Sequence, residues 1–536
     1  MASQLMALNP RQLQFTDATS CKHWLDALPL TNVPAAQQTL TQQIELLRQS
    51  SIAPSELLRV LEALREPVLF VQSELARKFS GRPLPLDANE SVVWARVQLL
   101  WLEYADAYLV CRDAHAIGDL RLMNSGALIM LRAMRCVGAA MFDHYRIYRQ
   151  VPAALWTKLN QLYVFAEQSG FARTTVTAKA KEGELETTCL AVYCQALLAH
   201  LANPFALSGR QMEFLAGWIE KWSLLAGLAA QPLPLSAIPA LAINIAGDAG
   251  PTFAEGMAPA TALRHLDLEL IGRTLRQLIT LLKQGQTPAQ LELGNDARQP
   301  GCENLLMLLY IQWCRAGTGR GEQRNANPEA AQVCLGIHAA HFHISGRAFR
   351  PPGASLSRQE EHDMQLFGHI SERTERQLAS HQSLAVESWQ LMNQSNSGFM
   401  CMLRDPDASL RIGHHQLVAV RRGSSKLFYV GLIQWVRAED EQSLFVGVRL
   451  FPGIARAIAV RPANFNAPAD ARGGFERGLL LPELPAPATP TTLLLPSGWY
   501  QQGRFVELHG EQKTVARLVN LIEKGSDFER CTVDIV

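Results

Sequence analysis

Three apolar runs decide the architecture of the second half of this chain: QLVAVRR at residues 416–422, LFYVGLIQWV at residues 427–436 and LFVGVRLF at residues 444–451. The runs are rich in β-branched and aromatic residues, and polar turn residues separate one run from the next. Short runs of this composition at close spacing are typical of antiparallel strands. They predict a β-barrel rather than a parallel sheet with crossover helices.

Further strand-like runs extend the predicted barrel toward the N-terminus. They are VCLGIHAAHFHI at 333–344, VESWQLM at 386–392 and FMCML at 399–403. The interval 345–385 is polar and charged, so we interpret it as an insertion, partly helical over residues 357–382. The predicted barrel therefore spans residues 333–475 and carries the insertion at 345–385.

The first half of the chain has the periodicity of helices. Apolar residues recur three and four positions apart, as at Leu57, Leu61 and Leu64, which places them on one face of a helix. The run LWTKLNQLYVFAE at 155–167 resembles one half of a tetratricopeptide-type hairpin, although the tandem period of about 34 residues is absent. We therefore predict an α-helical module over residues 1–300, built either of stacked hairpins or as a simple amphipathic bundle.

Two low-complexity segments mark the predicted domain boundaries. A Gly- and Arg-rich run, CRAGTGRGEQRNANP at 314–328, lies in a connector that we place at 301–332, and a Pro- and Ala-rich linker, LPELPAPATP, occupies 481–490. The tail at 491–536 has strand-like runs, but about 45 residues are too few for a comfortable independent core. The predicted fold is therefore multidomain α + β: a helical hairpin or bundle module, an antiparallel barrel, and a small β tail packed on that barrel.

The composition excludes two broad classes of protein. With 48% hydrophobic and 18% charged residues among 536, the chain is not mainly disordered. Lys and Arg number 50 and Asp and Glu 49, so the net charge is +1, whereas proteins that coat nucleic acid non-specifically carry a clear basic excess. We therefore expect no nucleic-acid partner, and any anion site must be local.

Several features favour a cytoplasmic location. The most apolar long run, residues 127–142, is interrupted by Arg132 and Arg135, so we expect no membrane span. The N-terminal residues lack the basic and apolar regions of a secretory signal. The ten cysteines are scattered without a CxxC pair, which suits buried thiols in a reducing compartment.

A polar motif lies between two of the predicted strands. Residues 393–398 read NQSNSG and fit the pattern D/N-x-S-x-x-G. The Asn amide can donate and accept toward the edge of a nucleotide base, the Ser hydroxyl can bond a phosphate, and the Gly permits a tight turn and close approach of a ligand. Asn393, Ser395 and Gly398 are therefore candidate ligand-binding residues; an ordinary polar turn is the alternative.

A pair of arginines lies in the connector before the first predicted strand. Arg320 and Arg324 form an R-x-x-x-R pattern beside several glycines. Two guanidinium groups on such a segment can bond phosphates bidentately and stack on guanine faces. The alternative is a solvated linker that its charges keep soluble.

Together these two motifs resemble the PilZ family of bacterial cyclic di-GMP receptors, over residues 315–465. A late strand ending in GVRLF is a further point of similarity. The resemblance implies that Arg320, Arg324, Asn393, Ser395 and Gly398 bind cyclic di-GMP. The two motifs lie about 70 positions apart, farther than is usual in a compact barrel of this family, and the predicted insertion must account for this spacing. Asn393 also occupies the motif position at which members of this family more commonly have Asp.

The resemblance implies a sensor in second-messenger signal transduction rather than an enzyme. Ligand binding at the connector–barrel junction would be coupled to an unidentified protein partner through a groove or apolar surface of the helical module. The alternative is a nucleotide-free, PilZ-like scaffold for protein–protein contacts. We expect no catalytic residues and no cofactor, because the sequence contains no catalytic or dinucleotide-binding motif. We also expect no metal site, because His341 and His343 would share one face of a strand without carboxylate or thiolate partners.

Overall fold

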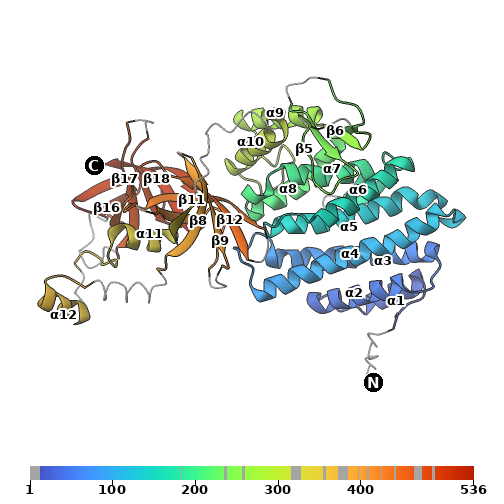
Figure 1. Cartoon of the computed structure of the whole chain (residues 1–536), viewed down its shortest axis with the longest axis horizontal. Helices are drawn as coiled ribbons and strands as arrows, with labels where there is room; N and C mark the ends of the chain where they lie inside the picture. The colour runs from blue at the N-terminus through green and yellow to red at the C-terminus, as the bar shows by residue number, and fades with distance from the viewer. Residues whose placement is uncertain are drawn as a thin grey trace. The chain divides into compact units, whose positions relative to one another are not determined.

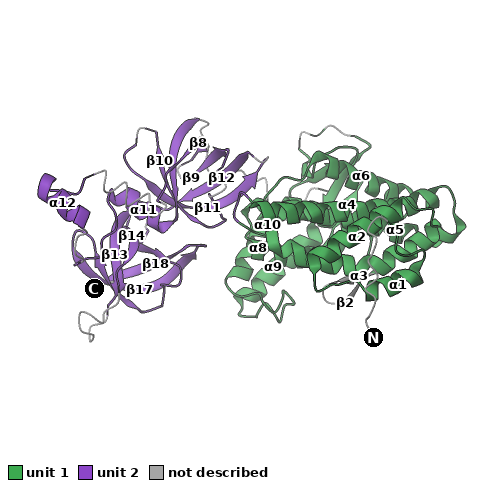
Figure 2. Ribbon diagram, turned by 90° about the horizontal axis from the view of Figure 1, so that it is seen from below, with its two compact units in different colours: residues 1–82, 86–320 green, residues 83–85, 321–536 purple. Residues whose placement is uncertain are grey.

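The computed structural model describes residues 12–180, 183–234, 238–255, 257, 260–315, 328–353, 358–371, 384–395, 397–406, 410–423, 425–439, 442–463, 474–485 and 489–536. The chain divides into two compact units (Figure 2). The helical unit comprises residues 1–82 and 86–320, and the β unit comprises residues 83–85 and 321–536. This division supports the prediction of a multidomain α + β protein.

The helical unit is built mainly of antiparallel helices (Figure 1). They are α1 (Ala18–Asp26), α2 (Val33–Arg48), α3 (Pro54–Phe79), α4 (Ala88–Ala116), α5 (Gly126–Arg146), α6 (Ala153–Gln168), α7 (Cys189–Leu201), α8 (Gly209–Trp222), α9 (Glu269–Lys283) and α10 (Gly301–Cys314). Side chains determine several of the starts: Ser208 and Gln211 form a capping box at α8, as do Asp87 and Glu90 at α4.

Helix α5 is a central helix of this unit and contacts α4, α6 and α7. The segment Leu120–Arg146 is long and apolar enough to cross a bilayer by length and composition, but 67% of its most apolar window is buried within the protein. It therefore packs as a core helix. Trp156, Tyr163 and Trp218 are also buried, as their positions on apolar stripes predict.

The prediction that the first 300 residues are helical throughout was wrong in two places. Strands β1 (Val176–Ala180) and β2 (Gly183–Thr187) form a hairpin. Strands β3 (Gly227–Ala229), β6 (Leu263–Asp267), β4 (Leu241–Asn244) and β5 (Thr252–Phe253) form an antiparallel sheet in that order. The sequence between β3 and β4 contains Pro232, Pro234 and Pro239, and proline both removes a backbone donor and blocks helix continuation.

In the β unit, an antiparallel barrel forms as predicted. Its strands are β7 (Glu329–Leu335), β8 (Glu387–Gln394), β9 (Gly398–Arg404), β10 (Leu417–Arg422), β11 (Tyr429–Ala438) and β12 (Ser443–Leu450). They close in the order β10-β11-β12-β9-β8-β7, and β7 pairs with both β8 and β10. We call this the first barrel.

The first strand of this barrel is shorter than predicted. The run 333–344 does not continue as a strand, because Gly336 has φ +81° and begins helix α11 (Gly336–Ser345). His341 and His343 therefore lie on a helix, and the prediction that they share a strand face was wrong. Helix α12 (Arg358–Phe367) lies in the predicted insertion; the remainder of 357–382 falls partly outside the described residues.

The end of the chain forms a second closed barrel rather than a small tail. Its strands are β13 (Arg456–Pro462), β14 (Glu476–Leu481), β15 (Thr492–Pro496), β18 (Phe528–Ile535), β17 (Lys513–Lys524) and β16 (Phe505–His509), in that spatial order. The predicted barrel bound at 475 was therefore wrong, because β13 pairs with β14 and β16. Recruiting β13 and β14 supplies core residues that 491–536 lack: Ile458 and Val460 of β13 pack with Leu508 of β16.

Helix α11 packs against both barrels and joins them through a shared core. Ile337 and Ala340 of α11 pack with Leu417 of the first barrel and with Leu479 and Phe528 of the second. The turn between β17 and β18 adds polar contacts: the Ser526 N–H donates to His415 O (2.9 Å) and Asp527 Oδ1 accepts from Leu417 N (2.8 Å). The two barrels are therefore one packed body.

The predicted connector at 301–332 is also shorter in the structure. Its first part is α10, a helix of the helical unit, and β7 begins at Glu329. Trp313 of α10 is buried and donates from Nε1 to Leu198 O (3.1 Å), which ties α10 to α7. Residues 316–327 lie outside the described residues.

Candidate functional site

The NQSNSG motif forms the turn between β8 and β9. Asn393 lies near the end of β8, Ser395 lies in the turn, and Gly398 is the first residue of β9. The Ser395 N–H donates to Gly398 O at 2.9 Å and closes the turn. The structure thus brings these three predicted residues together at one end of the first barrel.

The hydroxyl of Ser395 is only weakly engaged within this turn. It lies 3.4 Å from Ser397 Oγ and 3.5 Å from Gly398 O, and both distances exceed those of ordinary O–H···O bonds. The side chain is half-buried. The hydroxyl therefore retains capacity to donate to a ligand oxygen.

A β-bulge directs the side chain of Asn393. Leu391 pairs with Cys401 and Asn393 with Met400, so Met392 is an extra residue in β8. A bulge bends its strand and re-aims the side chains that follow, and bulges are common beside functional sites. The Asn393 amide donates from Nδ2 toward Met400 Sδ (3.7 Å). Strand-like composition alone contained no signal for this bulge.

Gly398 is required for strand packing rather than for a left-handed turn. A Cβ placed on Gly398 would lie 2.3 Å from the carbonyl oxygen of Val448, in the neighbouring strand β12. Real Cβ atoms do not approach backbone oxygens so closely, so a side chain would push β9 away from β12. The glycine of the motif therefore sets how tightly the turn sits on the barrel.

Arg422 is a residue of this site that the sequence analysis missed. It ends β10, and its Nη1 donates to Gln394 Oε1, inside the motif, at 2.7 Å. Its guanidinium lies 5.9 Å from the ring centre of Phe399 and 5.8 Å from that of Tyr429, within cation–π range. Its Nε is buried and has no hydrogen-bond partner among the described residues. The only signal in the sequence was a basic residue between an apolar strand and a polar turn.

Arg449, in the GVRLF run, lies opposite Gly398 in the β9–β12 ladder. Its guanidinium bonds to Glu523 of the second barrel and contacts Gln434 Oε1 (3.3 Å). Burial raises the pKa of Glu523, and Arg449 partly opposes that rise. This arginine is already paired, so its clear role is to hold the second barrel beside the motif strand.

The connector arginines, Arg320 and Arg324, lie outside the described residues. The register of β7 still constrains where the chain enters the barrel. Glu329 lies opposite Leu391, so antiparallel pairing places Pro328, the residue before it, at the end of β8 that leads into the motif turn. Arg324 is four positions before Pro328. An extended chain of that length places the two Cα atoms at most about 14 Å apart.

Histidine and cysteine side chains show no metal-binding arrangement in the described part of the chain, where no group of three metal-ligating residues occurs. His341 packs edge-on against Phe349, and burial lowers its pKa to about 4. The ten cysteines are buried and free, as predicted. Burial raises the pKa of Cys401, in β9, to about 12, so it is a structural thiol.

Two family models match this chain, one before the first barrel in the sequence and one after it. The model described as "Cyclic-di-GMP receptor FimW, N-terminal domain" matches residues 19–232, most of the helical unit. The model described as "FimW C-terminal beta-barrel domain" matches residues 463–535, most of the second barrel. The two matches together cover more than half of the chain. Its helical unit and its second barrel are therefore both similar to domains of FimW-type cyclic di-GMP receptors. A relative from Pseudomonas aeruginosa, the protein "Cyclic-di-GMP receptor FimW", is 24% identical over 94% of this chain and 88% of its own length.

The FimW match confirms the resemblance to cyclic di-GMP receptors that the two motifs indicated. It also shows that the helical unit and the second barrel are similar to domains of such a receptor. Neither of these parts carries a recognisable motif, so sequence reasoning described them only as a helical module and a β tail.

Proposed function

We propose that this protein is a receptor that binds cyclic di-GMP at the motif end of the first barrel. One observation supports the proposal most directly: the β8–β9 turn, the guanidinium of Arg422 and the start of β7 converge at that end. The name of the P. aeruginosa relative supports the same ligand.

Each residue has a role that suits its chemistry. Arg320 and Arg324 would bond the phosphates and stack on guanine faces, and Ser395 would donate to a phosphate oxygen. Asn393 would contact a base edge, and Gly398 keeps the turn close to β12. Arg422 would add a fixed positive charge beneath the turn, because Gln394, Phe399 and Tyr429 already hold its guanidinium.

Ligand binding would also change the coupling between the two units. The boundary between them falls at residues 320 and 321, inside the R-x-x-x-R pattern. A ligand that fixes both arginines on the first barrel therefore stabilises a subset of unit arrangements, because a ligand shifts an equilibrium toward the state that it binds better. The helical unit would then report this change to a protein partner in the cytoplasm. The activity proposed is binding without turnover.

Isothermal titration calorimetry on the full chain tests the ligand. Cyclic di-GMP should bind in preference to GTP and cyclic GMP. Arg320→Ala, Arg324→Ala and Ser395→Ala should each weaken binding by roughly 10- to 100-fold, because one charge-assisted contact contributes about 1.5–3 kcal/mol. Arg456→Ala, an exposed arginine of the second barrel, is the matched control and should bind normally.

Two outcomes would count against parts of the proposal. Absence of cyclic di-GMP binding by the parent protein would favour the nucleotide-free scaffold. Unchanged affinity in all three variants would contradict the site while leaving the ligand in place. Small-angle scattering with and without ligand addresses the unit rearrangement separately, since unchanged scattering with intact binding would contradict only that step. Partner capture by the full chain, compared with a chain lacking residues 1–290, tests the reporting role of the helical unit.

A further inference from the structure

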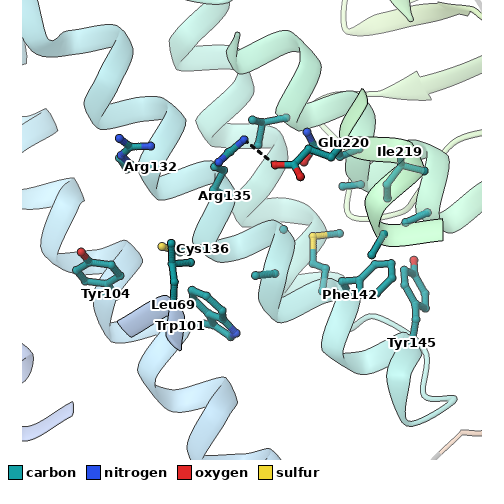
Figure 3. A pocket seen from close by; sticks show the side chains of 18 of the residues that line it. Leu69, Trp101, Tyr104, Arg132, Arg135, Cys136, Phe142, Tyr145, Ile219 and Glu220 are labelled. Carbon is teal, nitrogen blue, oxygen red and sulfur yellow. Dashed lines mark hydrogen bonds and ion pairs between the residues drawn. The ribbon is translucent and has the colours of Figure 1, made fainter. Parts of the chain in front are cut away.

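The helical unit contains a cavity of ≈ 300 Å³ along one face of α5 (Figure 3). The α5 residues that line it include Arg135, Gly138, Ala139, Phe142 and Arg146, which recur three, four and seven positions apart and so share one face. Helices α3 and α4 contribute lining residues on one side, and α7 and α8 on the other. None of these residues belongs to the cyclic di-GMP site proposed above.

Small and aromatic side chains shape this cavity. Its base includes Gly138 and Ala139, and Trp101, Phe142 and Tyr145 supply aromatic surface. In Figure 3, Phe142 and Tyr145 lie together; they follow Arg135 in α5 by seven and ten positions. A volume near 300 Å³ with mostly apolar lining falls at the small end of the range for small-molecule sites. A helix from a partner protein, about 10 Å across, is too large for this space.

Arginines give the cavity a positive end. Arg132 is only 6% exposed and is held by Glu62 (Nη2–Oε2 2.9 Å), while its Nη1 is buried without a partner among the described residues. Arg135 lies at the same end of the cavity and contacts Glu220 Oε1 through its Nη2 (3.3 Å). Arg65 also lines the cavity, and no carboxylate is paired with it in the part of the chain that the structure describes.

The charges around Arg135 also favour an anion at this end of the cavity. Burial lowers the pKa of the Arg135 guanidinium, Glu220 opposes that fall, and repulsion from Arg132 and Arg65 adds to it. Guanidinium groups that repel one another at one end of an apolar cavity are stabilised by an added anion. The aromatic surface beside it suits a flat or aliphatic body attached to that anion.

We propose that this cavity binds a small organic anion with an apolar body. Its carboxylate, sulfonate or phosphate group lies at the Arg65–Arg135 end, and its apolar body lies on Gly138 and Ala139 beside Phe142. This inference stands independently of cyclic di-GMP binding, since it concerns a different unit of the chain.

A pair of fluorescent probes tests the proposal on the full-length protein. Anilinonaphthalene sulfonate is an aromatic anion that brightens in apolar sites, and N-phenylnaphthylamine is its neutral counterpart without the sulfonate. The parent protein should bind the sulfonate saturably at one site and more tightly than the neutral probe. Equal affinity for the two probes would overturn the anionic part of the proposal.

Substitutions of two glycines test the location. A Cβ on Gly138 meets nothing within 4 Å, so Gly138→Leu fills the cavity without a backbone clash and raises helix propensity. Gly217→Leu on α8 is the matched control, because its Cβ also meets nothing within 4 Å and Gly217 does not line the cavity. The first variant should lose sulfonate binding by about 10-fold or more, and the second should retain it.

Normal sulfonate binding by Gly138→Leu would overturn the assignment to this cavity. Melting curves confirm that both variants are folded, and Ala139→Phe fills the same base by an independent substitution if Gly138→Leu is unstable. Arg65→Gln then tests the charge. It should weaken sulfonate binding roughly 10-fold and leave the neutral probe unchanged, because only the charge-assisted contact is lost. An equal loss for both probes would contradict the role of Arg65.

Discussion

Individual residues of the β8–β9 turn have separable structural and ligand-binding roles. Gly398 sets the approach of β9 to β12, whereas the Ser395 hydroxyl makes only long contacts within the turn. Arg422 links the turn to β10 through Gln394. Substitutions at these positions should therefore affect stability and affinity in different proportions.

Gly398→Ala should destabilise the β unit. The added Cβ would lie 2.3 Å from Val448 O, and a backbone oxygen cannot move aside as a flexible side chain can. Overpacking of this kind costs about 1–3 kcal/mol. Gly474→Ala is the control, because a Cβ there meets nothing within 4 Å. Chemical denaturation of both variants measures the difference, and equal free energies of unfolding would contradict the packing role.

Arg422→Lys should weaken cyclic di-GMP binding by roughly 10-fold while the melting temperature of the free protein changes little. Lysine keeps the charge but loses the planar fork that bonds Gln394 and lies beside Phe399 and Tyr429. Calorimetric titration beside Arg456→Ala checks the affinity. A large fall in melting temperature with unchanged affinity would instead make Arg422 a structural residue of the barrel.

At the level of elements, the turn between β17 and β18 joins the two barrels and carries a half-buried acid, Asp527. Asp527 accepts a hydrogen bond from the Leu417 N–H, yet burial raises its pKa from its ordinary value of 3.8 to about 6. Ionised Asp527 therefore opposes the packing that this turn provides. The stability of the β unit should therefore fall as the Asp527 carboxyl loses its proton.

The β unit should lose stability as pH rises from about 4 to about 6, because folded Asp527 holds its proton more tightly than unfolded Asp527. A carboxamide at this position cannot ionise, and its oxygen can still accept from the Leu417 N–H. Asp527→Asn should therefore be more stable than the parent by roughly 3 kcal/mol at pH 7.5, at about 1.4 kcal/mol per pKa unit. The two proteins should converge below pH 4. Urea titrations across this pH range provide the measurement, and a constant difference at all pH values would contradict the titration.

For the whole molecule, the two units have their own cores and the proposed ligand binds only the β unit. Cyclic di-GMP at about 100 times its dissociation constant should stabilise the state that it binds by about 2.7 kcal/mol. Hydrogen exchange read by mass spectrometry should show slower exchange in β8, β9 and β10. Equal protection in α1 to α4 would indicate a ligand site in the helical unit and contradict the proposal.

Sequence patterns by themselves determined the division into a helical half and a β half, since periods of about 3.6 and 2 residues are local properties. The same holds for the motif turn, because Asn393, Ser395 and Gly398 lie within six consecutive positions. Helices α4 and α5 and the capping box at Ser208 were also predictable from neighbouring residues.

Only the tertiary structure decided which strands share a barrel. β13 lies just after β12 in sequence, yet it pairs with β14 and β16, because barrel closure depends on partners far along the chain. Arg422 reaches the motif across 28 positions for the same reason. Run 333–344 became a strand followed by a helix because α11 buries Ile337 and Ala340 against both barrels. Such contacts join residues that are distant in sequence, so local composition does not predict them.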